Sequence, residues 1–271
     1  VKIAMDLPDS FTLIEWIIAN WNVGNTVLIL DPRLKEAEKE ARLNHFSPDM
    51  IISRFDKRTG SLPSFQPEVD VQIEDYDIER RYRTKSGTDA ADNADTPLLS
   101  LYSSGSTGVA KHITRTRSSL AEELTHYGAE PGAPGSGSVV LSLVPASHAF
   151  GLISACIHTL HVGGTVIYPT MLKPGDIAEL IERHQVTHVY GVPFHYRLLE
   201  KAIADLAVNT RPVFISSGAA LPAGLAETYR ESGFVLTEQY GMSDVGYIAV
   251  DFTGSKPGTV GRIASHHRYR V

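Results

Sequence analysis

Residues 98–111 read Leu98-Leu99-Ser100-Leu101-Tyr102-Ser103-Ser104-Gly105-Ser106-Thr107-Gly108-Val109-Ala110-Lys111. In this stretch an apolar segment is followed at once by hydroxyl residues, two glycines and a lysine. Glycine lets a backbone turn tightly and approach a ligand, and successive N–H groups in such a turn form an anion-binding concavity. Hydroxyl groups add further donors, and the lysine adds a mobile positive charge. The combination predicts a strand that ends in a polyphosphate-binding loop.

This loop differs in its spacing from the common phosphate-binding motifs. A Walker motif ends in Gly-Lys-Ser/Thr, whereas Lys111 lies three residues after Gly108 and is followed by His112. The segment also lacks the three spaced glycines of a dinucleotide-binding fingerprint. A Ser/Gly-rich surface turn is therefore an open alternative for the segment considered alone.

Residues 102–111 closely resemble the phosphate loop of the adenylate-forming superfamily, which comprises acyl- and aryl-CoA synthetases, adenylation domains of peptide synthetases and luciferases. The family loop reads roughly Tyr-Thr/Ser-Ser-Gly-Ser/Thr-Thr-Gly-x-Pro-Lys-Gly. This sequence departs from it at Ala110, where the family usually has proline, and at His112, where the family usually has glycine. Both departures lie at the end of the loop, so they concern its flexibility more than its donors.

Further segments resemble landmarks of the same family and occur in the family's order. Residues 22–32 are similar to an early helix-to-strand segment, and residues 145–152 are similar to the substrate-side segment of the CoA ligases. Residues 216–222 are similar to the adenine-side loop, residues 240–244 to the family's Tyr-Gly-x-Thr/Ser-Glu, and residues 258–262 to a later landmark. The resemblance covers essentially the whole chain.

The composition is that of an ordinary globular protein. Of 271 residues, 42% are hydrophobic and 21% are charged, which suffices to bury a substantial core. The net charge of −6 argues against a general nucleic-acid binder, which would carry a basic excess. The single cysteine, Cys156, cannot form an internal disulfide, so we expect a small core residue in a reducing compartment and a cytoplasmic location.

The sequence shows no pattern of a targeting or membrane-spanning segment. No run reaches the roughly eighteen continuous apolar residues of a transmembrane helix, and residues 11–18 are short and interrupted by Glu15. The chain opens with Val-Lys-Ile-Ala-Met, which is strand-like and unlike a secretory signal. Because the chain has no initial methionine, we expect it to be cut from a longer protein.

Strand and helix patterns alternate along the chain. Besides the strand before the phosphate loop, the predicted strands are residues 26–30, 50–53, 139–144, 165–168, 186–190 and 212–216. The predicted helices are residues 33–44, 152–160, 177–184, 194–206 and about 222–232. This alternation predicts an α/β fold of mostly parallel sheets flanked by helices. By the resemblance, it is part of the large domain of the acyl-CoA synthetase-like fold.

Local signals refine this pattern. Residues 54–97 are polar and acidic with little periodicity, which predicts loops and a mobile connection leading into the phosphate loop. Asp176 precedes Glu179 by three residues, which predicts a capping box for the helix over residues 177–184. Pro193 opens the helix over residues 194–206, where a first-turn proline is tolerated.

In an α/β sheet, ligands bind outside the carboxyl ends of the strands, and the three loop motifs each follow an expected strand. The resemblance implies that these motifs bind ATP together. Residues 217–220 would border adenine, Tyr240 would stack on the base, and Ser243 would contact the α-phosphate. The cofactor-binding residues expected in this way are Ser103, Ser104, Gly105, Ser106, Thr107, Gly108, Lys111, Ser217, Gly218, Ala219, Ala220, Tyr240, Gly241, Met242 and Ser243.

The same resemblance implies a metal and a substrate side. Asp244 would bind magnesium (Mg2+), although the family usually has the longer glutamate; a loop-capping carboxylate is the alternative. His148 would adjoin the substrate carboxylate and later the thiol tunnel, with a backbone hydrogen bond at a helix entry as its alternative. Phe150, Val192 and Gly246 would line the acyl pocket, for which plain core packing is an equally open interpretation.

The activity implied by the resemblance is attack of a carboxylic acid on the α-phosphorus of ATP, giving an acyl adenylate and pyrophosphate. A thiol, from CoA or from the phosphopantetheine of a carrier protein, then takes the acyl group. His148, Lys111 and Ser243 are the expected catalytic residues, acting by position and charge. The alternatives are an adenylation enzyme that loads an acyl or peptidyl carrier protein, and a non-catalytic nucleotide-binding remnant.

Parts of the family pattern have no counterpart in the sequence. These are the later aspartate that binds ribose, the hinge, the small C-terminal domain with its catalytic lysine, and the first segment of the large domain. We therefore expect residues 1–271 to be a fragment of the AMP-binding large domain, without the small C-terminal domain.

Overall fold

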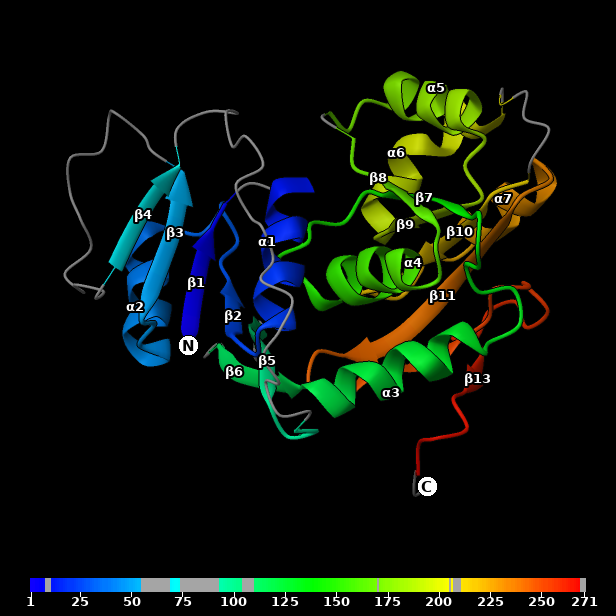
Figure 1. The fold of residues 1–271 in the computed structure, drawn as a ribbon. Coiled ribbons are helices and arrows are strands. Elements are labelled where there is room, and N and C mark those ends of the chain that lie inside the picture. Colours follow the sequence, from blue (N-terminus) through cyan, green and yellow to red (C-terminus); the bar gives the residue numbers. More distant parts are fainter. Residues whose placement is uncertain are drawn as a thin grey trace. The chain divides into compact units, whose positions relative to one another are not determined.

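The computed structural model describes residues 1–7, 11–54, 69–73, 93–103, 110–169, 171–204, 206 and 211–268. The chain forms two compact units, Val1–Leu120 and Ala121–Val271, and the boundary between them lies within helix α3 (Arg117–Gly128). Each unit is built on a sheet of its own, and Figure 1 shows these sheets with their helices.

The first unit has a six-stranded sheet in the order β4-β3-β1-β2-β5-β6. Its strands are β1 (Lys2–Asp6), β2 (Thr26–Ile29), β3 (Met50–Arg54), β4 (Val69–Ile73), β5 (Pro97–Ser103) and β6 (Lys111–Thr116). All neighbours pair in parallel except β6, which runs antiparallel to β5. β1 and β2 are buried over most of their length, as expected of central parallel strands.

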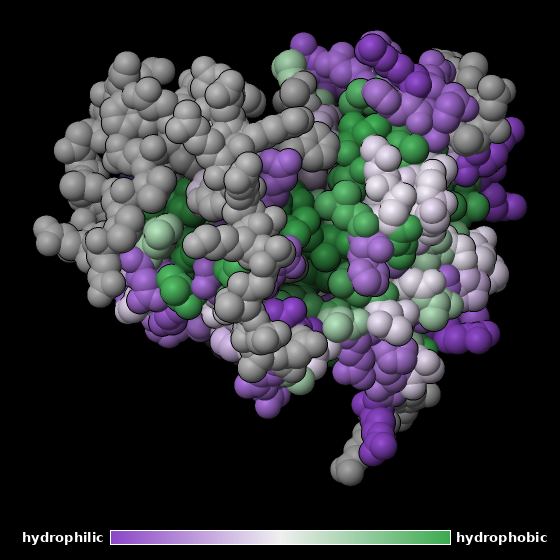
Figure 2. All heavy atoms as spheres, viewed as in Figure 1, coloured by the Kyte–Doolittle hydropathy of each residue, from purple (hydrophilic) through white to green (hydrophobic). Residues whose placement is uncertain are grey.

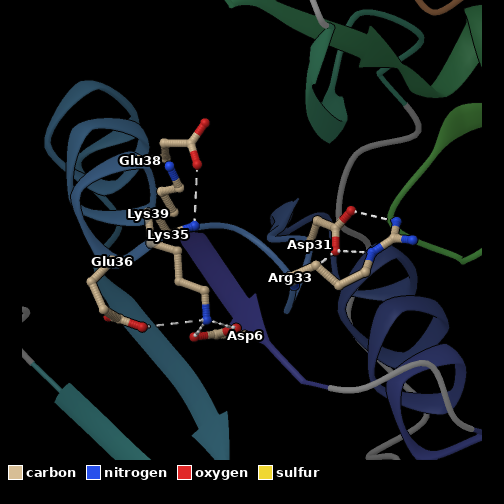
Figure 3. A network of polar contacts seen from close by, with 7 residues as sticks. All are labelled: Asp6, Asp31, Arg33, Lys35, Glu36, Glu38 and Lys39. Carbon is tan, nitrogen blue, oxygen red and sulfur yellow. Dashed lines mark hydrogen bonds and ion pairs between the residues drawn. The ribbon is translucent and has the colours of Figure 1, made fainter.

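Helices α1 (Phe11–Asn22) and α2 (Glu36–Phe46) belong to the first unit. α2 carries many charges and buries Leu43 and Phe46. Its Lys39 ammonium group lies 2.9 and 2.8 Å from the two carboxylate oxygens of Asp6, at the end of β1 (Figure 3). Because the Lys39 side chain is only 12% exposed, solvent screens this ion pair less than a surface pair, and it ties α2 to the sheet.

The second unit has a seven-stranded sheet in the order β13-β12-β11-β10-β9-β7-β8. Its strands are β7 (Val139–Ser142), β8 (Thr165–Ile167), β9 (His188–Gly191), β10 (Val213–Ser216), β11 (Val235–Met242), β12 (Gly246–Val250) and β13 (Arg262–Ile263). Neighbours from β8 to β11 pair in parallel, whereas β12 and β13 join in antiparallel. Buried side chains of strands and helices form the core, among them Tyr196, Phe214 and Tyr229.

A helical segment follows each of the strands β7 to β10. These segments are the π-helical η1 (Phe150–Ile157) with α4 (His158–His161), then α5 (Pro174–His184), α6 (Pro193–Ala204) and α7 (Leu225–Glu231). α5 buries Ile177 and Ile181, and Figure 2 shows a hydrophilic outer surface over this helix. None of the helices in the described part of the chain is long and apolar enough to cross a membrane.

The predicted α/β fold with mostly parallel sheets flanked by helices is confirmed. Each strand predicted from the pattern has a counterpart: β2, β3, β5, β7, β8, β9 and β10. The helices expected over residues 33–44 and 194–206 correspond to α2 and α6. Helices α1 and α3 and the antiparallel strands β6, β12 and β13 were not predicted.

Two local predictions are wrong, and a third omitted a strand. Lys173 is the N-cap of α5 and Pro174 its first residue, so Asp176 lies inside the first turn and cannot start a capping box. Residues 69–73, in the stretch expected to form loops, pair with β3 as strand β4; residues 55–68 and 74–92 lie outside the described residues. The helix expected from residue 222 begins at Leu225, because Gly224 has a left-handed φ of 83° that a helix does not continue.

The apolar helix expected over residues 152–160 is π-helical at its start, where it packs against the turn after β7. A Cβ atom on Gly151 would lie 2.3 Å from the Pro145 carbonyl oxygen and 2.8 Å from the Val144 carbonyl oxygen. The obstacle is main chain, which cannot swing away as a flexible side chain can. Glycine at this position therefore permits η1 to approach the turn, and η1 is buried from Gly151 to Ile157.

We expect Gly151→Ala to destabilise the second unit by about 1–3 kcal/mol, because overpacking against main chain forces backbone shifts. Gly175→Ala is the matched control: Gly175 lies in α5, nothing lies within 4 Å of its Cβ position, and alanine favours a helix by about 0.5–1 kcal/mol. Urea unfolding followed by circular dichroism compares the two variants. A wild-type unfolding midpoint for Gly151→Ala would contradict the close approach.

Candidate functional site

The structure describes both ends of the predicted phosphate loop. Ser103 ends β5, Lys111 begins β6, and the two residues are partners in the antiparallel pair. Ser103 is half-buried and Lys111 is exposed. The other predicted residues of the loop lie outside the described residues: Ser104, Gly105, Ser106, Thr107 and Gly108. The strand pair thus holds the two ends of the loop opposite each other.

A cluster of aromatic and basic side chains lies next to these two ends. Tyr102 and His112 are cross-strand partners, and the Tyr102 hydroxyl lies 2.7 Å from His45 Nδ1 and 3.2 Å from the Arg42 carbonyl oxygen. Burial, with smaller contributions from His45 and Lys2, lowers the pKa of His112. The cluster fastens the base of the loop to α2, a helix that no sequence motif connects with the loop.

In the second unit, four parallel strands end at one edge of the sheet. The register pairs Ser142 with Tyr190, and it pairs Ser216 with both Gly191 and Glu238. This is the edge at which ligands bind in α/β sheets. Most predicted site residues of this unit follow these strand ends: His148, Phe150, Val192, Ser217, Gly218, Ala219, Ala220, Ser243 and Asp244. Tyr240, Gly241 and Met242, expected in a loop after a strand, instead lie within β11, beyond its last pairing with β10, where they pair with β12.

The loop after β10 is held against its neighbours through its backbone. The Ser217 N–H donates to the Gly191 carbonyl oxygen at 3.2 Å, and the Leu221 N–H donates to Glu238 Oε1 at 2.9 Å. Residues 218–220 between these anchors are exposed, and the glycine among them has a φ of 87°. With small side chains, this segment leaves its backbone open to a flat ligand.

Strands β11 and β12 form a hairpin that presents the second motif. Met242 pairs with Gly246, and residues 243–245 form the turn. The side chains of Tyr240 and Met242 are 50% and 49% exposed. An exposed tyrosine ring on the strand next to an exposed small-residue loop provides a surface on which a nucleotide base can stack.

The turn of the hairpin carries two side chains with oxygen atoms. Ser243 is half-buried and Asp244 is exposed. Among the residues that the structure describes, no group of three or more His, Cys, Asp or Glu side chains is arranged to hold a metal ion. Magnesium is commonly held by one or two carboxylates together with substrate phosphates. The donor set at Asp244 therefore fits a magnesium ion that arrives with a nucleotide.

The residues predicted on the substrate side differ in exposure. His148 is exposed, and its carbonyl oxygen accepts the Leu152 N–H at 2.8 Å, at the entry of η1. Phe150 and Val192 are half-buried. The Val192 N–H donates to His195 Nδ1 at 3.2 Å, and burial lowers the pKa of His195, which favours the neutral ring that accepts this bond. Sequence reasoning did not identify His195.

Gly246, the fourth predicted residue on the substrate side, is buried and lies against α3. Its φ is 89°, and a Cβ atom at this position would lie 2.5 Å from the carboxylate carbon of Glu123. Glu123 is 6% exposed. Sequence reasoning missed Glu123, because a glutamate in a mostly polar helix gives no signal that it is buried.

A buried chain of polar groups lies just inside the predicted site residues. The Tyr190 and Tyr127 hydroxyls are 3.1 Å apart, Tyr127 donates to Gln239 Oε1 at 2.6 Å, and Gln239 Nε2 donates to Ser154 Oγ at 3.0 Å. Burial raises the pKa of Tyr127 well above its ordinary value. This series of hydrogen bonds connects α3, β9, β11 and η1. It reaches the predicted site because Gln239 directly precedes Tyr240. Its members are far apart in the sequence, so no local pattern indicates it.

Comparison with curated proteins finds ligases that carry a related segment. The chain is 32% identical over 154 residues to a feruloyl-CoA synthase of Amycolatopsis, which covers 55% of the chain and 31% of that protein. It is 25% identical to an uncharacterized acyl-CoA ligase of Bacillus subtilis, over 100% of the chain and 56% of that protein. A 3,4-dihydroxybenzoate–[aryl-carrier protein] ligase of Bacillus anthracis is 27% identical over 58% of the chain and 37% of that protein. The chain thus spans about a third to about half of these relatives.

Solved structures share the fold. The N-terminal domain of FACL13 from Mycobacterium tuberculosis has a TM-score of 0.81 at 20% identity, over 97% of the chain and 69% of that domain. A malonyl-CoA ligase with methylmalonyl-CoA and AMP bound has a TM-score of 0.77 at 22% identity, over 97% of the chain and 56% of that protein. The sequence model of the AMP-binding enzyme family matches residues 1–271. The resemblance seen in the motifs is confirmed, and the chain belongs to the AMP-binding enzyme family of adenylate-forming ligases.

Proposed function

We propose that this chain is the nucleotide- and acid-binding part of a ligase that activates a carboxylic acid with ATP and transfers it to the thiol of CoA. One observation carries the proposal: the loop of residues 217–220, exposed from residue 218 on, follows β10, and the exposed Tyr240 lies in the neighbouring strand β11, two residues beyond its last pairing with β10. A base between them is held by backbone groups on one side and by an aromatic ring on the other.

In the proposed reaction, a carboxylate oxygen of the acid attacks the α-phosphorus of ATP. The bond from this phosphorus to the bridging oxygen of pyrophosphate breaks, and pyrophosphate leaves with the electron pair. The thiol then attacks the acyl carbon of the adenylate, gives up its proton to solvent, and releases AMP. The protein contributes by orienting the reactants and by stabilising the charge that develops on the phosphate oxygens.

The nucleotide contacts are divided among the motifs. Tyr240 and the backbone of residues 217–220 bind the adenine, and the Ser243 hydroxyl donates to the α-phosphate. Ser103, Lys111 and the glycine-rich residues between them bind the β- and γ-phosphates. Lys111 is well suited to this role because an ammonium group on a flexible stem can follow the leaving pyrophosphate.

The remaining residues serve the metal and the acid. Asp244 would hold the magnesium ion, which supplies positive charge to the triphosphate when it is bound. His148, exposed at the entry of η1, binds the carboxylate of the acid. Phe150 and Val192, which are half-buried, line the acyl pocket together with Gly246.

CoA is the favoured acceptor, and a carrier protein is the second candidate. The relatives include a feruloyl-CoA synthase and a 4-coumarate–CoA ligase of Arabidopsis thaliana, and they also include a 3,4-dihydroxybenzoate–[aryl-carrier protein] ligase. These names favour an aromatic acid as the first substrate class to test. Because the chain spans less than two thirds of the length of these relatives, the activity is proposed for the whole protein.

We expect pyrophosphate exchange into ATP that depends on a carboxylic acid and on magnesium, when the complete protein that carries this chain is assayed. The panel contains hydroxycinnamic, benzoic, aliphatic and amino acids. Hydroxylamine trapping of the acyl group, and then thioester formation with CoA or with a phosphopantetheinylated carrier protein, identify the product and the acceptor.

The exchange assay separates the remaining candidates. Exchange followed by transfer only to the carrier protein would favour the adenylation enzyme. Binding of ATP without exchange for any acid of the panel would contradict the proposal and leave a non-catalytic nucleotide-binding protein.

We expect Asp244→Asn to raise the magnesium concentration needed for half-maximal exchange at least about tenfold, because the variant keeps the shape of the side chain but removes the charge that attracts the ion. Asp244→Glu is the matched control, since it keeps the charge. Isothermal titration with a non-hydrolysable acyl-adenylate analogue should give nearly equal affinities for all three proteins. An unchanged magnesium dependence in Asp244→Asn would instead indicate that Asp244 only caps the turn.

A further inference from the structure

Glu123 of α3 is a buried carboxylate that contacts the hairpin of the proposed site. It is 6% exposed, and its Oε1 accepts the backbone N–H of Tyr247 at 3.1 Å. Tyr247 is the second residue of β12 and lies three residues after Asp244. The carboxylate therefore reaches the hairpin where β12 begins, directly after the turn that carries the predicted phosphate and magnesium residues.

Because Gly246 has no side chain, it leaves room for this carboxylate. With a φ of 89°, it holds a conformation that side chains rarely adopt. A Cβ atom at this position would lie 2.5 Å from both Glu123 Cδ and Oε2. The carboxylate thus occupies the place where a side chain of residue 246 would be, and it packs directly on the backbone of the hairpin.

A second carboxylate holds the other end of the same tyrosine. The Tyr247 hydroxyl donates to Glu130 Oε1 at 3.2 Å, and Glu130 lies two residues beyond the end of α3. The Tyr247 ring is 1% exposed and packs edge-on against Tyr127 of α3 at 4.9 Å between ring centres. Tyr247 is therefore fixed to this helix by its backbone, its ring and its hydroxyl.

The hairpin transmits this position to its turn. Gly241 is the cross-strand partner of Tyr247, and a Cβ atom on Gly241 would lie 2.7 Å from the Gly246 carbonyl oxygen. Met242 pairs with Gly246, which leaves a turn of residues 243–245. A turn this short has little freedom, so a shift of Gly246 moves Ser243 and Asp244 with it.

We propose that Glu123 is a positioning residue: its Oε1 fixes the start of β12 and thereby sets where Ser243 and Asp244 meet the nucleotide phosphates and their magnesium ion. The proposal rests on the proposed function for its catalytic consequence. The contact invoked is the hydrogen bond from the Tyr247 N–H, which depends on the length of the side chain and on its acceptor atom.

Two conservative variants separate the effect of the length of the Glu123 side chain from the effect of its negative charge. Glu123→Gln keeps the length of the side chain and a carbonyl oxygen that accepts the Tyr247 N–H, but it removes the charge. Glu123→Asp keeps the charge but is one methylene shorter, so it withdraws the acceptor and leaves a buried N–H without it. The matched controls are Glu122→Gln and Glu122→Asp, because Glu122 is the exposed neighbour in the same helix.

For Glu123→Asp, we expect kcat of pyrophosphate exchange to fall at least about tenfold, since misplaced reacting groups cost rate steeply, and the magnesium requirement to rise. The KM for the acid should change less than about twofold. Glu123→Gln and both Glu122 variants should stay within about twofold of the wild type in kcat and in magnesium requirement. Wild-type kinetics in Glu123→Asp, or a larger loss in Glu123→Gln than in Glu123→Asp, would overturn the proposal.

Amide hydrogen exchange gives a readout that needs no activity and no unstable variant. In the wild-type protein, the Tyr247 amide should exchange as slowly as that of Ala249, which also lies in β12. Glu123→Asp should accelerate exchange over residues 241–247, whereas Glu123→Gln should not. Rapid exchange at Tyr247 in the wild type would overturn the proposal even if Glu123→Asp did not fold. A different result separates the two proposals. If the wild type shows no pyrophosphate exchange into ATP but its Tyr247 amide hydrogen exchanges slowly, the proposed function is overturned and the contact between Glu123 and Tyr247 is not.

Discussion

The parallel register of β9, β10 and β11 is the constraint on which the proposed site of the second unit depends. Ser216 pairs with Gly191 on one side and with Glu238 on the other. From α6, the Tyr196 hydroxyl lies 3.0 and 2.6 Å from carbonyl oxygens of β9 and β10. A Cβ atom on Gly191 would lie 2.8 Å from the Tyr196 ring, so the glycine permits this contact. The ends of the strands are therefore fixed relative to one another. The loops that follow start at positions set by the sheet.

The sequence could predict the features that follow from local pattern and residue type. Apolar runs separated by polar helices indicate buried parallel strands. This pattern identified strands at residues 26–30, 186–190 and 212–216. It also predicted that ligands bind where the carboxyl ends of these strands meet. Glycines and hydroxyl residues after the strand over residues 98–103 mark a phosphate loop because only such residues expose a dense set of donors. The ordered motifs then identified the family, since several short motifs in a fixed order are far more specific than any one of them.

The sequence could not predict the features that depend on contacts between distant residues. Gly151 looks like an ordinary glycine in an apolar helix, and only the packed turn at Pro145 shows why a side chain is excluded there. Glu123 looks like one of several charges on a polar helix, and only the fold buries it against β12. The polar chain from Tyr190 to Ser154 joins residues from four elements. Such contacts have no period and no spacing in the sequence, so tertiary structure alone reveals them.

The claim that an adenine base is held between residues 217–220 and Tyr240 is tested most directly by titrating the protein with AMP while the backbone amides are observed by nuclear magnetic resonance. The predicted result is saturable binding, with the largest shifts in residues 217–220 and 240–243 and with a marked loss of affinity in Tyr240→Ala. A matched change at the exposed Phe194 of α6, Phe194→Ala, should leave the affinity unchanged. Saturable binding with shifts confined to other parts of the chain, or equal affinities for Tyr240→Ala and the wild type, would contradict the proposed placement of the nucleotide.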